Sequence, residues 1–386
     1  MSLHESLNSL AVPHLGGVQL PLETVAKSVE NAVDSLCDAN VCALGAPRPA
    51  KLWRPKRAVF LPAALELAHG QRIKSRLESL GIETQILKSN RLTGLNQESA
   101  AKTYATAKQT LAIVAAPASQ FRLSPIPPSA DWQFHLAQGC PAHCQYCYLA
   151  GSLSGPPIVR AYANLDEILG NLAAYESREI TTFEASCYTD PLGIEHLTGS
   201  LARAIAYFGT RENAFLRVVS KFDAVDDLLD LPHNGHTRFR ASVNAAPISD
   251  TLEGGTANVA ARLLGLRKMA QRGYPVGLVV APIMPLDDWP THYETLLAAA
   301  QNALDFPCDL TFELITHRFT PGSKDVLLQW YPATKLDLDE SKREVKRNKF
   351  GGTKFVYPRE TMRELKTWFQ TQIEQRFPDA KILYWT

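Results

Sequence analysis

The chain has 386 residues, of which 45% are hydrophobic and 20% are charged, a composition typical of a globular protein with a sizeable core. Its formal net charge is only +1 at pH 7, which excludes a uniformly basic nucleic-acid-binding protein. No apolar run reaches the roughly 18 residues of a membrane helix, and the N-terminus lacks a signal-peptide pattern. We therefore expect a cytoplasmic protein without membrane contacts.

The N-terminal third divides into two parts. Residues 1–50 show weak periodicity and are interpreted as an N-terminal extension. Residues 51–130 are predicted to form a small α/β domain, with strands at 57–61, 83–88 and 110–116 and a helix at 66–80. Pro125, Pro127 and Pro128 mark a linker after this domain.

Strand and helix patterns alternate regularly from 131 to 329. The predicted strands are 132–136, 180–186, 215–220, 237–243, 276–281 and 310–316. The predicted helices are 165–178, 195–208, 224–231, 256–272 and 291–303. Such alternation indicates parallel strands joined by right-handed crossovers. The fold class is therefore predicted to be α/β, with a partial (β/α)6 barrel.

The C-terminal segment, 330–386, contains a basic cluster. Six basic residues lie between 341 and 354 against one acid, Glu344: Lys342, Arg343, Lys346, Arg347, Lys349 and Lys354. A Gly-Gly pair at 351–352, between short aromatic and β-branched runs, predicts a hairpin. A helix at 358–376 and a strand at 381–385 close the chain. The cluster suits contacts with phosphates, although composition alone fits a solvated helix face equally well.

Three of the seven cysteines lie close together, as Cys140, Cys144 and Cys147 in a C-x3-C-x2-C pattern. Closed structural zinc sites need four ligands. A [4Fe-4S] cluster held by three thiolates keeps one iron open, and an open iron is what S-adenosylmethionine (SAM) binds in radical SAM enzymes. The alternatives are a zinc site completed by His143, within the spacer, and a cluster of buried thiols.

Polar residues recur where the predicted strands end. They are Cys140, Cys187, Lys221, Asn244 and His317, with Pro282 at the equivalent place on another strand. In β/α barrels the carboxyl ends of the strands carry the active site. The strand pattern and the cysteine spacing thus independently indicate the same face.

Several longer motifs resemble the spore photoproduct lyases, which are radical SAM DNA repair enzymes that split a thymine–thymine ultraviolet lesion. The similarity runs from about 53 to 386, with motifs at 54–57, 139–149, 162–168, 187–198, 220–222, 242–244, 312–320 and 331–340. Residues 1–50 have no counterpart in the family. In the hairpin, Lys349-Phe350 replaces the family's basic residue followed by tyrosine.

The resemblance implies roles for residues of the predicted barrel. Cys187 is expected to donate a hydrogen atom, and Tyr146 and Tyr148 to relay one back to its radical, unless these tyrosines only pack around cluster and adenosine. Expected SAM contacts are Thr189, Lys221, Ser242, Asn244 and Glu184. Side-chain alternation along the strand leaves open whether Glu184 or Cys187 faces the site.

The implied partners are damaged DNA and an electron donor such as flavodoxin or ferredoxin, with the protein a monomer. The expected DNA contacts are Lys349, Phe350, Arg347, Tyr357, His317 and Arg318, the last three being weaker candidates. The Lys349-Phe350 pair keeps open a second hypothesis, a radical SAM enzyme acting on another nucleic-acid lesion or a small substrate. A third hypothesis is a non-enzymatic, metal-stabilised DNA-binding protein.

Overall fold

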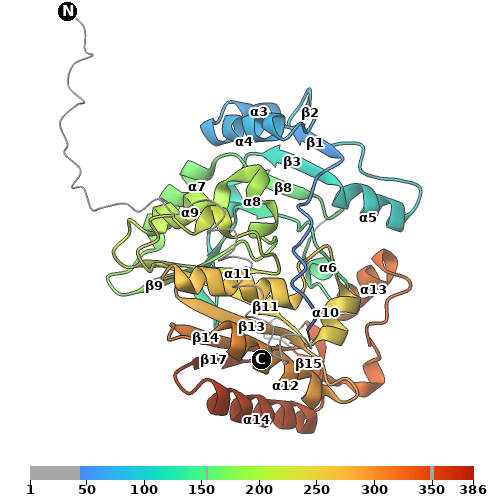
Figure 1. The fold of residues 1–386 in the computed structure, drawn as a ribbon. Coiled ribbons are helices and arrows are strands. Elements are labelled where there is room, and N and C mark those ends of the chain that lie inside the picture. The colour runs from blue at the N-terminus through green and yellow to red at the C-terminus, as the bar shows by residue number, and fades with distance from the viewer. Residues whose placement is uncertain (1–43, 154, 348–351) are drawn as a thin grey trace, which may run out of the picture. The chain divides into compact units, whose positions relative to one another are not determined.

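The computed structural model describes residues 44–153, 155–347 and 352–386, all within one compact unit (Figure 1). The predicted divisions at 130 and 330 therefore do not separate independent units. Most of the predicted extension lies outside the described residues. Its last residues belong to this unit, where the Arg48 and Ala50 amides donate to Asn258 (2.8 Å) and Asp223 (2.9 Å). None of the described helices is long and apolar enough to cross a membrane.

A five-stranded sheet is formed by the small α/β part together with two strands beyond the predicted linker. Its order is β2-β1-β3-β8-β6, and only β6 is antiparallel. The strands are β1 (Arg57–Phe60), β2 (Thr84–Ile86), β3 (Thr110–Val114), β6 (Ala137–Gln138) and β8 (Val159–Tyr162). The accompanying helices are α3 (Pro62–Leu65), α4 (Ala68–Ser79) and α5 (Ala100–Lys108). Because β6 and β8 flank the cysteine motif, this sheet holds both ends of the cysteine loop.

The second sheet has eight strands in the order β17-β14-β13-β11-β10-β9-β5-β4. Only β4 is antiparallel, and the edge strands β4 and β17 do not pair, so the sheet is a curled, open half-barrel. The strands are β4 (Ser124–Ile126), β5 (Ala130–Phe134), β9 (Thr181–Ala185), β10 (Ala214–Ser220), β11 (Thr237–Val243), β13 (Val276–Ile283), β14 (Leu310–Thr316) and β17 (Lys381–Trp385). All six predicted barrel strands are present, and β17 adds a seventh parallel strand.

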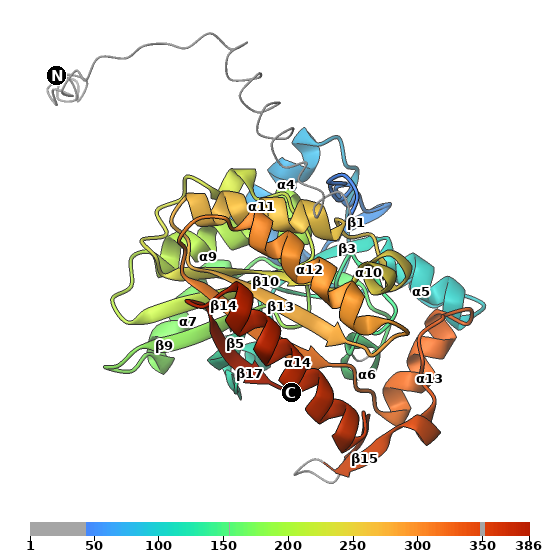
Figure 2. The same ribbon diagram turned by 60° about the horizontal axis from the view of Figure 1, so that its bottom comes forward.

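Helices cover the outer face of this sheet, where α9, α11, α12 and α14 follow one another across it (Figure 2). The helices after β8 are α7 (Leu165–Leu172), α8 (Glu195–Thr198), α9 (Ser200–Phe208), α10 (Ala246–Leu252), α11 (Val259–Gln271), α12 (Trp289–Ala303), α13 (Pro321–Trp330) and α14 (Arg359–Arg376). The predicted helix at 195–208 is divided at Gly199, whose φ of 64° is left-handed. The predicted helix at 224–231 is only a short 3₁₀ turn, Asp226–Leu228.

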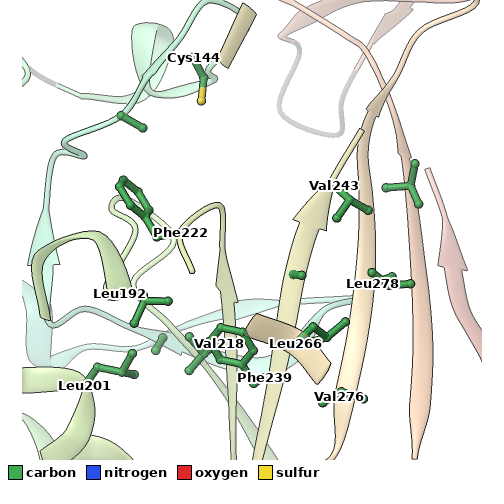
Figure 3. Packing of buried hydrophobic residues seen from close by; sticks show 14 of the residues in the cluster. Cys144, Leu192, Leu201, Val218, Phe222, Phe239, Val243, Leu266, Val276 and Leu278 are labelled. Carbon is green, nitrogen blue, oxygen red and sulfur yellow. The ribbon is translucent and has the colours of Figure 1, made fainter. Parts of the chain in front are cut away.

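The apolar core lies between the half-barrel and these helices. Figure 3 shows Val218, Phe239 and Leu278 from neighbouring strands packing with Leu266 of α11, and Cys144 beyond the ends of the strands. These four side chains are at most 2% exposed, and burial of the whole apolar core contributes the main favourable free energy of folding.

Two arginines and two glutamates form an ion network within the half-barrel. Arg240 pairs with Glu313 at 2.8 Å and with Glu184, and Arg217 also pairs with Glu313. The Tyr384 hydroxyl, from the last strand, donates to Glu313 at 2.7 Å. Buried charges are tolerated when they are paired and hydrogen-bonded. The two positive charges balance the two negative charges. The four charged side chains come from β9, β10, β11 and β14, so the network joins these strands to β17.

We expect the stability of the protein to fall at mildly acid pH because of His69 on α4. His69 is 1% exposed and contacts the Ser200 hydroxyl (2.9 Å); burial first, then Arg203, lowers its pKa to about 4. In the unfolded chain His69 therefore binds a proton below about pH 6.5, whereas in the folded chain it is protonated only below about pH 4. At pH 5 this costs about 2 kcal/mol of the free energy of unfolding.

Denaturant unfolding of the wild type and of His69→Gln between pH 8 and 4.5 measures this contribution. The variant should lose less stability on acidification. An identical pH dependence for both proteins would contradict the assignment to His69.

Candidate active site

The three cysteines of the motif lie on the loop between β6 and α6 (Leu149–Ser152). Within this loop β7 (His143–Cys144) pairs antiparallel with β12 (Glu253–Gly254). All three thiols are free, and burial raises their pKa values to about 11 for Cys140, 12 for Cys144 and 11 for Cys147. Each thiol also interacts electrostatically with another of the three, so the fold gathers them at one place.

Gly139, before the first cysteine, has a conformation and surroundings that require glycine. Its φ is +78°, and a Cβ there would lie 1.9 Å from the Ile158 carbonyl oxygen. We expect Gly139→Ala to displace the loop and to cut the iron retained after anaerobic reconstitution by more than half. Iron and sulfide assays measure the effect, with Gly170→Ala as control because a Cβ at Gly170 meets nothing within 4 Å. Full iron content in Gly139→Ala would contradict the prediction.

The residues present fit a thiolate-bound iron–sulfur cluster. Among the described residues, no group of three or more His, Cys, Asp or Glu side chains is placed so that it could hold a single metal ion. The thiolates of a cubane cluster bind different irons, so they do not need to converge on one point. The Lys108 ammonium, 5% exposed, interacts electrostatically with all three thiols and has no carboxylate partner among the described residues. An anionic thiolate-bound cluster would balance this buried charge.

Next to the cysteine loop lies a buried charge cluster centred on Glu253. The Glu253 carboxylate accepts from the Tyr146 hydroxyl and pairs with Lys221 at 3.3 Å and Arg262 at 2.6 Å. Burial opposes ionisation of Glu253, but Arg262 and Lys221 outweigh it and lower the pKa to about 2. Glu253 was not predicted; the only signal in the sequence is the Gly-Gly pair after it, which lets this strand approach His143 closely.

Lys221 lies just beyond β10, as predicted. Its ammonium donates to the Ser242 hydroxyl at 2.6 Å on β11 and lies 5.7 Å from the centre of the Tyr146 ring. The Asp190 carboxylate accepts from the Lys221 amide at 2.7 Å and from the Ser220 hydroxyl at 2.8 Å. These contacts fix the turn that carries Lys221 and place its charge beside the cysteine loop.

The end of β9 decides the direction of Cys187. The strand stops at Ala185, and Ser186 takes a left-handed conformation with φ of 58°, held by its hydroxyl accepting from the Leu136 amide at 2.9 Å. Cys187 therefore leaves the strand alternation. Its thiol is half-buried, and burial raises its pKa to about 12, which keeps the S–H bond intact at neutral pH.

Tyr148 lies between the cysteine loop and the end of β9. It directly follows Cys147 and is 55% exposed. The Tyr148 ring also lies 6.4 Å from that of Tyr188. The Tyr146 hydroxyl instead donates to Glu253, so the two predicted relay tyrosines have different surroundings.

Two of the expected SAM contacts have other roles in this structure. The Glu184 carboxylate belongs to the ion network, and its second oxygen accepts from Ser129 at 2.9 Å, which corrects the expectation of a free carboxylate. Asn244 is fully buried, donates to the Pro282 carbonyl at 2.8 Å and accepts from the Tyr293 hydroxyl at 3.1 Å. The buried Thr189 hydroxyl, by contrast, has no partner in the described structure and suits a ligand.

The predicted hairpin consists of β15 (Glu344–Arg347) and β16 (Thr353–Val356). Lys346 and Lys354 are opposite each other in its register, and Phe319 pairs with Phe355, which brings Arg318 to the same place. None of these three basic side chains has an ion pair within the described ranges. Arg318, Lys346 and Arg347 are exposed, and Lys354 is half-buried. Lys349 and Phe350 lie outside the described residues.

The expectation that His317 and Tyr357 face DNA is corrected by the position of Arg343. His317 is 3% exposed, and Arg343 donates to its carbonyl at 3.2 Å. The Arg343 guanidinium lies 3.7 Å from the centre of the Tyr357 ring and covers it. These three residues connect the hairpin to the end of β14, which is a structural role.

Known proteins are similar to this chain over most of its length. Two relatives described as spore photoproduct lyase come from Geobacillus sp. (strain Y412MC61), 43% identical over 343 residues, and Bacillus subtilis (strain 168), 40% identical over 338. These matches cover 87% and 86% of this chain and 100% and 98% of the relatives.

Solved structures agree with these relatives. A spore photoproduct lyase complexed with dinucleoside spore photoproduct matches with a TM-score of 0.83 at 40% identity, over 87% of this chain and 100% of that one. A mutant with bound AdoMet and the same ligand also has a TM-score of 0.83, at 39% identity and with the same coverage. The spore photoproduct lyase family model matches residues 53–386, so the chain belongs to this family.

Proposed function

We propose that this chain is a radical SAM lyase that repairs a spore-photoproduct-type thymine lesion in DNA. The observation that carries the proposal is the meeting of the cysteine loop with the end of β9: the ring of Tyr148, which follows Cys147, lies 6.4 Å from that of Tyr188, which follows Cys187. A cluster site and a hydrogen donor thus occupy the same end of the half-barrel. A metal-stabilised binding protein has no need of this arrangement.

The cofactor residues follow from the same geometry. Cys140, Cys144 and Cys147 would hold a [4Fe-4S] cluster, which supplies one electron for the reductive cleavage of SAM. Lys221 and Thr189 offer an ammonium and an unpartnered hydroxyl beside the loop, suited to the carboxylate and polar groups of SAM. Ser242 orients the Lys221 ammonium through its 2.6 Å hydrogen bond.

Cys187 is proposed to quench the substrate radical. Its raised pKa keeps the thiol protonated, so a hydrogen atom is available to a carbon radical left by scission of the bridge between the thymines. The S–H bond breaks, a C–H bond forms, and the unpaired electron stays on sulfur. Tyr148 would then donate the hydrogen atom of its hydroxyl to this sulfur, which restores the thiol and moves the unpaired electron to the tyrosine oxygen. A hydrogen atom from 5′-deoxyadenosine would in turn restore the tyrosine.

The partners follow from the surface and the chemistry. The basic group of Arg318, Lys346 and Lys354 would contact DNA phosphates, together with Arg347 of β15. Lys349 and Phe350, which follow β15 in the sequence, are proposed to contact the DNA as well. A low-potential carrier such as flavodoxin or ferredoxin would supply the electron, and the protein would act as a monomer in the cytoplasm.

The decisive assay incubates anaerobically reconstituted protein with dithionite, SAM and a synthetic dinucleoside spore photoproduct. Chromatography should show restored thymidine dinucleotide with little 5′-deoxyadenosine. Cleavage of SAM with an intact lesion would overturn this substrate and favour another nucleic-acid lesion. Protein without iron and sulfide would overturn the radical chemistry itself.

A further inference from the structure

One face of α5 is directed at the cysteine loop, although this helix is outside every motif singled out in the sequence. Tyr104 and Lys108 are one helical turn apart and are 7% and 5% exposed. The Tyr104 hydroxyl contacts the His143 Nδ1 at 3.1 Å, within the C-x3-C spacer. The Lys108 ammonium donates to the carbonyls of Cys140 and Ala142. The helix thus holds the loop at two points.

Tyr104 and Lys108, which make these contacts, differ in charge. Tyr104 is a neutral side chain that stacks on Trp330 of α13 and contacts the Tyr331 hydroxyl, so it belongs to an aromatic support of the loop. Lys108 is a buried cation whose only hydrogen-bond acceptors in the described structure are two carbonyls. An ammonium in such surroundings is costly unless negative charge lies nearby, and the negative charge nearest to it in a loaded protein would be that of the thiolate-bound cluster.

We propose that Lys108 is a positioning residue for the iron–sulfur cluster that also raises its reduction potential. This inference rests on the proposed function only in requiring a cluster on Cys140, Cys144 and Cys147. Reduction adds one electron from a low-potential donor to the cluster. A fixed positive charge stabilises the reduced form more than the oxidised form, because the reduced form carries one more negative charge. Lys108 therefore makes the cluster easier to reduce.

Four variants separate the effect of the Lys108 charge from the effect of losing a contact with the cysteine loop. Lys108→Gln removes the charge but keeps an N–H donor, and Lys108→Met removes both. Tyr104→Phe removes the hydroxyl contacts with His143 and Tyr331 without a change in charge. Lys102→Met is the matched control, since Lys102 is on the same helix but is exposed and pairs with Glu98.

The experiment is a redox titration of each reconstituted protein without SAM or lesion, followed by the electron paramagnetic resonance signal of the reduced cluster. Lys108→Gln and Lys108→Met should show about a tenfold lower ratio of reduced to oxidised cluster at a fixed potential, a shift of about 59 mV. Tyr104→Phe and Lys102→Met should titrate like the wild type. Tyr104→Phe and Lys108→Met should both retain less iron.

A wild-type potential in Lys108→Gln with full iron content would overturn the inference, as would an equal shift in Tyr104→Phe. If Lys108→Gln retains no cluster, Lys108→Arg decides: restored iron supports the need for a cation, whereas equal loss in both overturns it. A cluster-free wild type would instead refute the proposed function. Failure of the inference on Lys108 and failure of the proposed function therefore give different results.

Discussion

Cys187→Ala is expected to abolish clean repair while leaving the cluster and the cleavage of SAM intact. The substrate radical would then lack its hydrogen donor and be trapped by another reagent, giving adducts in place of the thymidine dinucleotide. Loss of clean turnover should exceed about 100-fold, which is the scale reported for removal of a positioned proton-transfer group. Chromatography with mass spectrometry of the products measures both yields.

Cys308→Ala is the matched control for this variant. Cys308 is also free and half-buried, but it precedes β14, at the opposite end of the strand from the site. It should repair the lesion like the wild type. Clean repair by Cys187→Ala at the wild-type rate would refute the assignment of the hydrogen donor.

Neutralising the basic group on the hairpin is expected to weaken binding to duplex DNA without affecting a dinucleoside substrate. The variant is Arg318→Gln combined with Lys346→Gln and Lys354→Gln. The slope of log affinity against log salt should fall by about 0.9 for each phosphate contact removed. Binding titrations over a series of salt concentrations measure the slope, and the dinucleoside assay measures the chemistry.

A control replaces three lysines that pair with acids on other surfaces: Lys74 with Glu78, Lys102 with Glu98 and Lys268 with Asp226. It removes the same number of positive charges, so any general effect of net charge appears in both proteins. An equal loss of affinity in the control would show that the hairpin makes no specific contact. A loss of dinucleoside repair in the hairpin variant would place these residues in the active site.

The arrangement of the barrel could be predicted because strand identity depends on local patterns. The strands 237–243 and 310–316 were predicted to the residue, since apolar residues alternate with polar ones along most of each run. The helix α5 was missed, because Ala100–Lys108 has little amphipathic contrast and gains its stability from the loop that it contacts. The boundary at 130 was misplaced because β6 and β8 join a sheet formed by earlier strands, a pairing that has no local signal.

The partners of the buried polar residues also have no local signal in the sequence. Glu184 and Asn244 lie at strand positions that suit a ligand, but whether such a side chain is free depends on partners distant in sequence. Arg240 and Tyr293 are these partners, 56 and 49 residues away. His317 and Tyr357 likewise contact a residue distant in sequence, Arg343, which directly precedes the hairpin.

The sequence by itself determined the class of fold, the closely spaced group of three cysteines, and the strand ends at which Cys187 and Lys221 lie, because spacing and periodicity are local properties. Only the tertiary structure decided which of the polar residues remain available. It turned Cys187 out of the strand through Ser186, engaged Glu184 in the ion network, and brought Glu253 and Lys108 to the cysteine loop. These outcomes depend on hydrogen bonds and ion pairs between distant segments, which form only when the chain is folded.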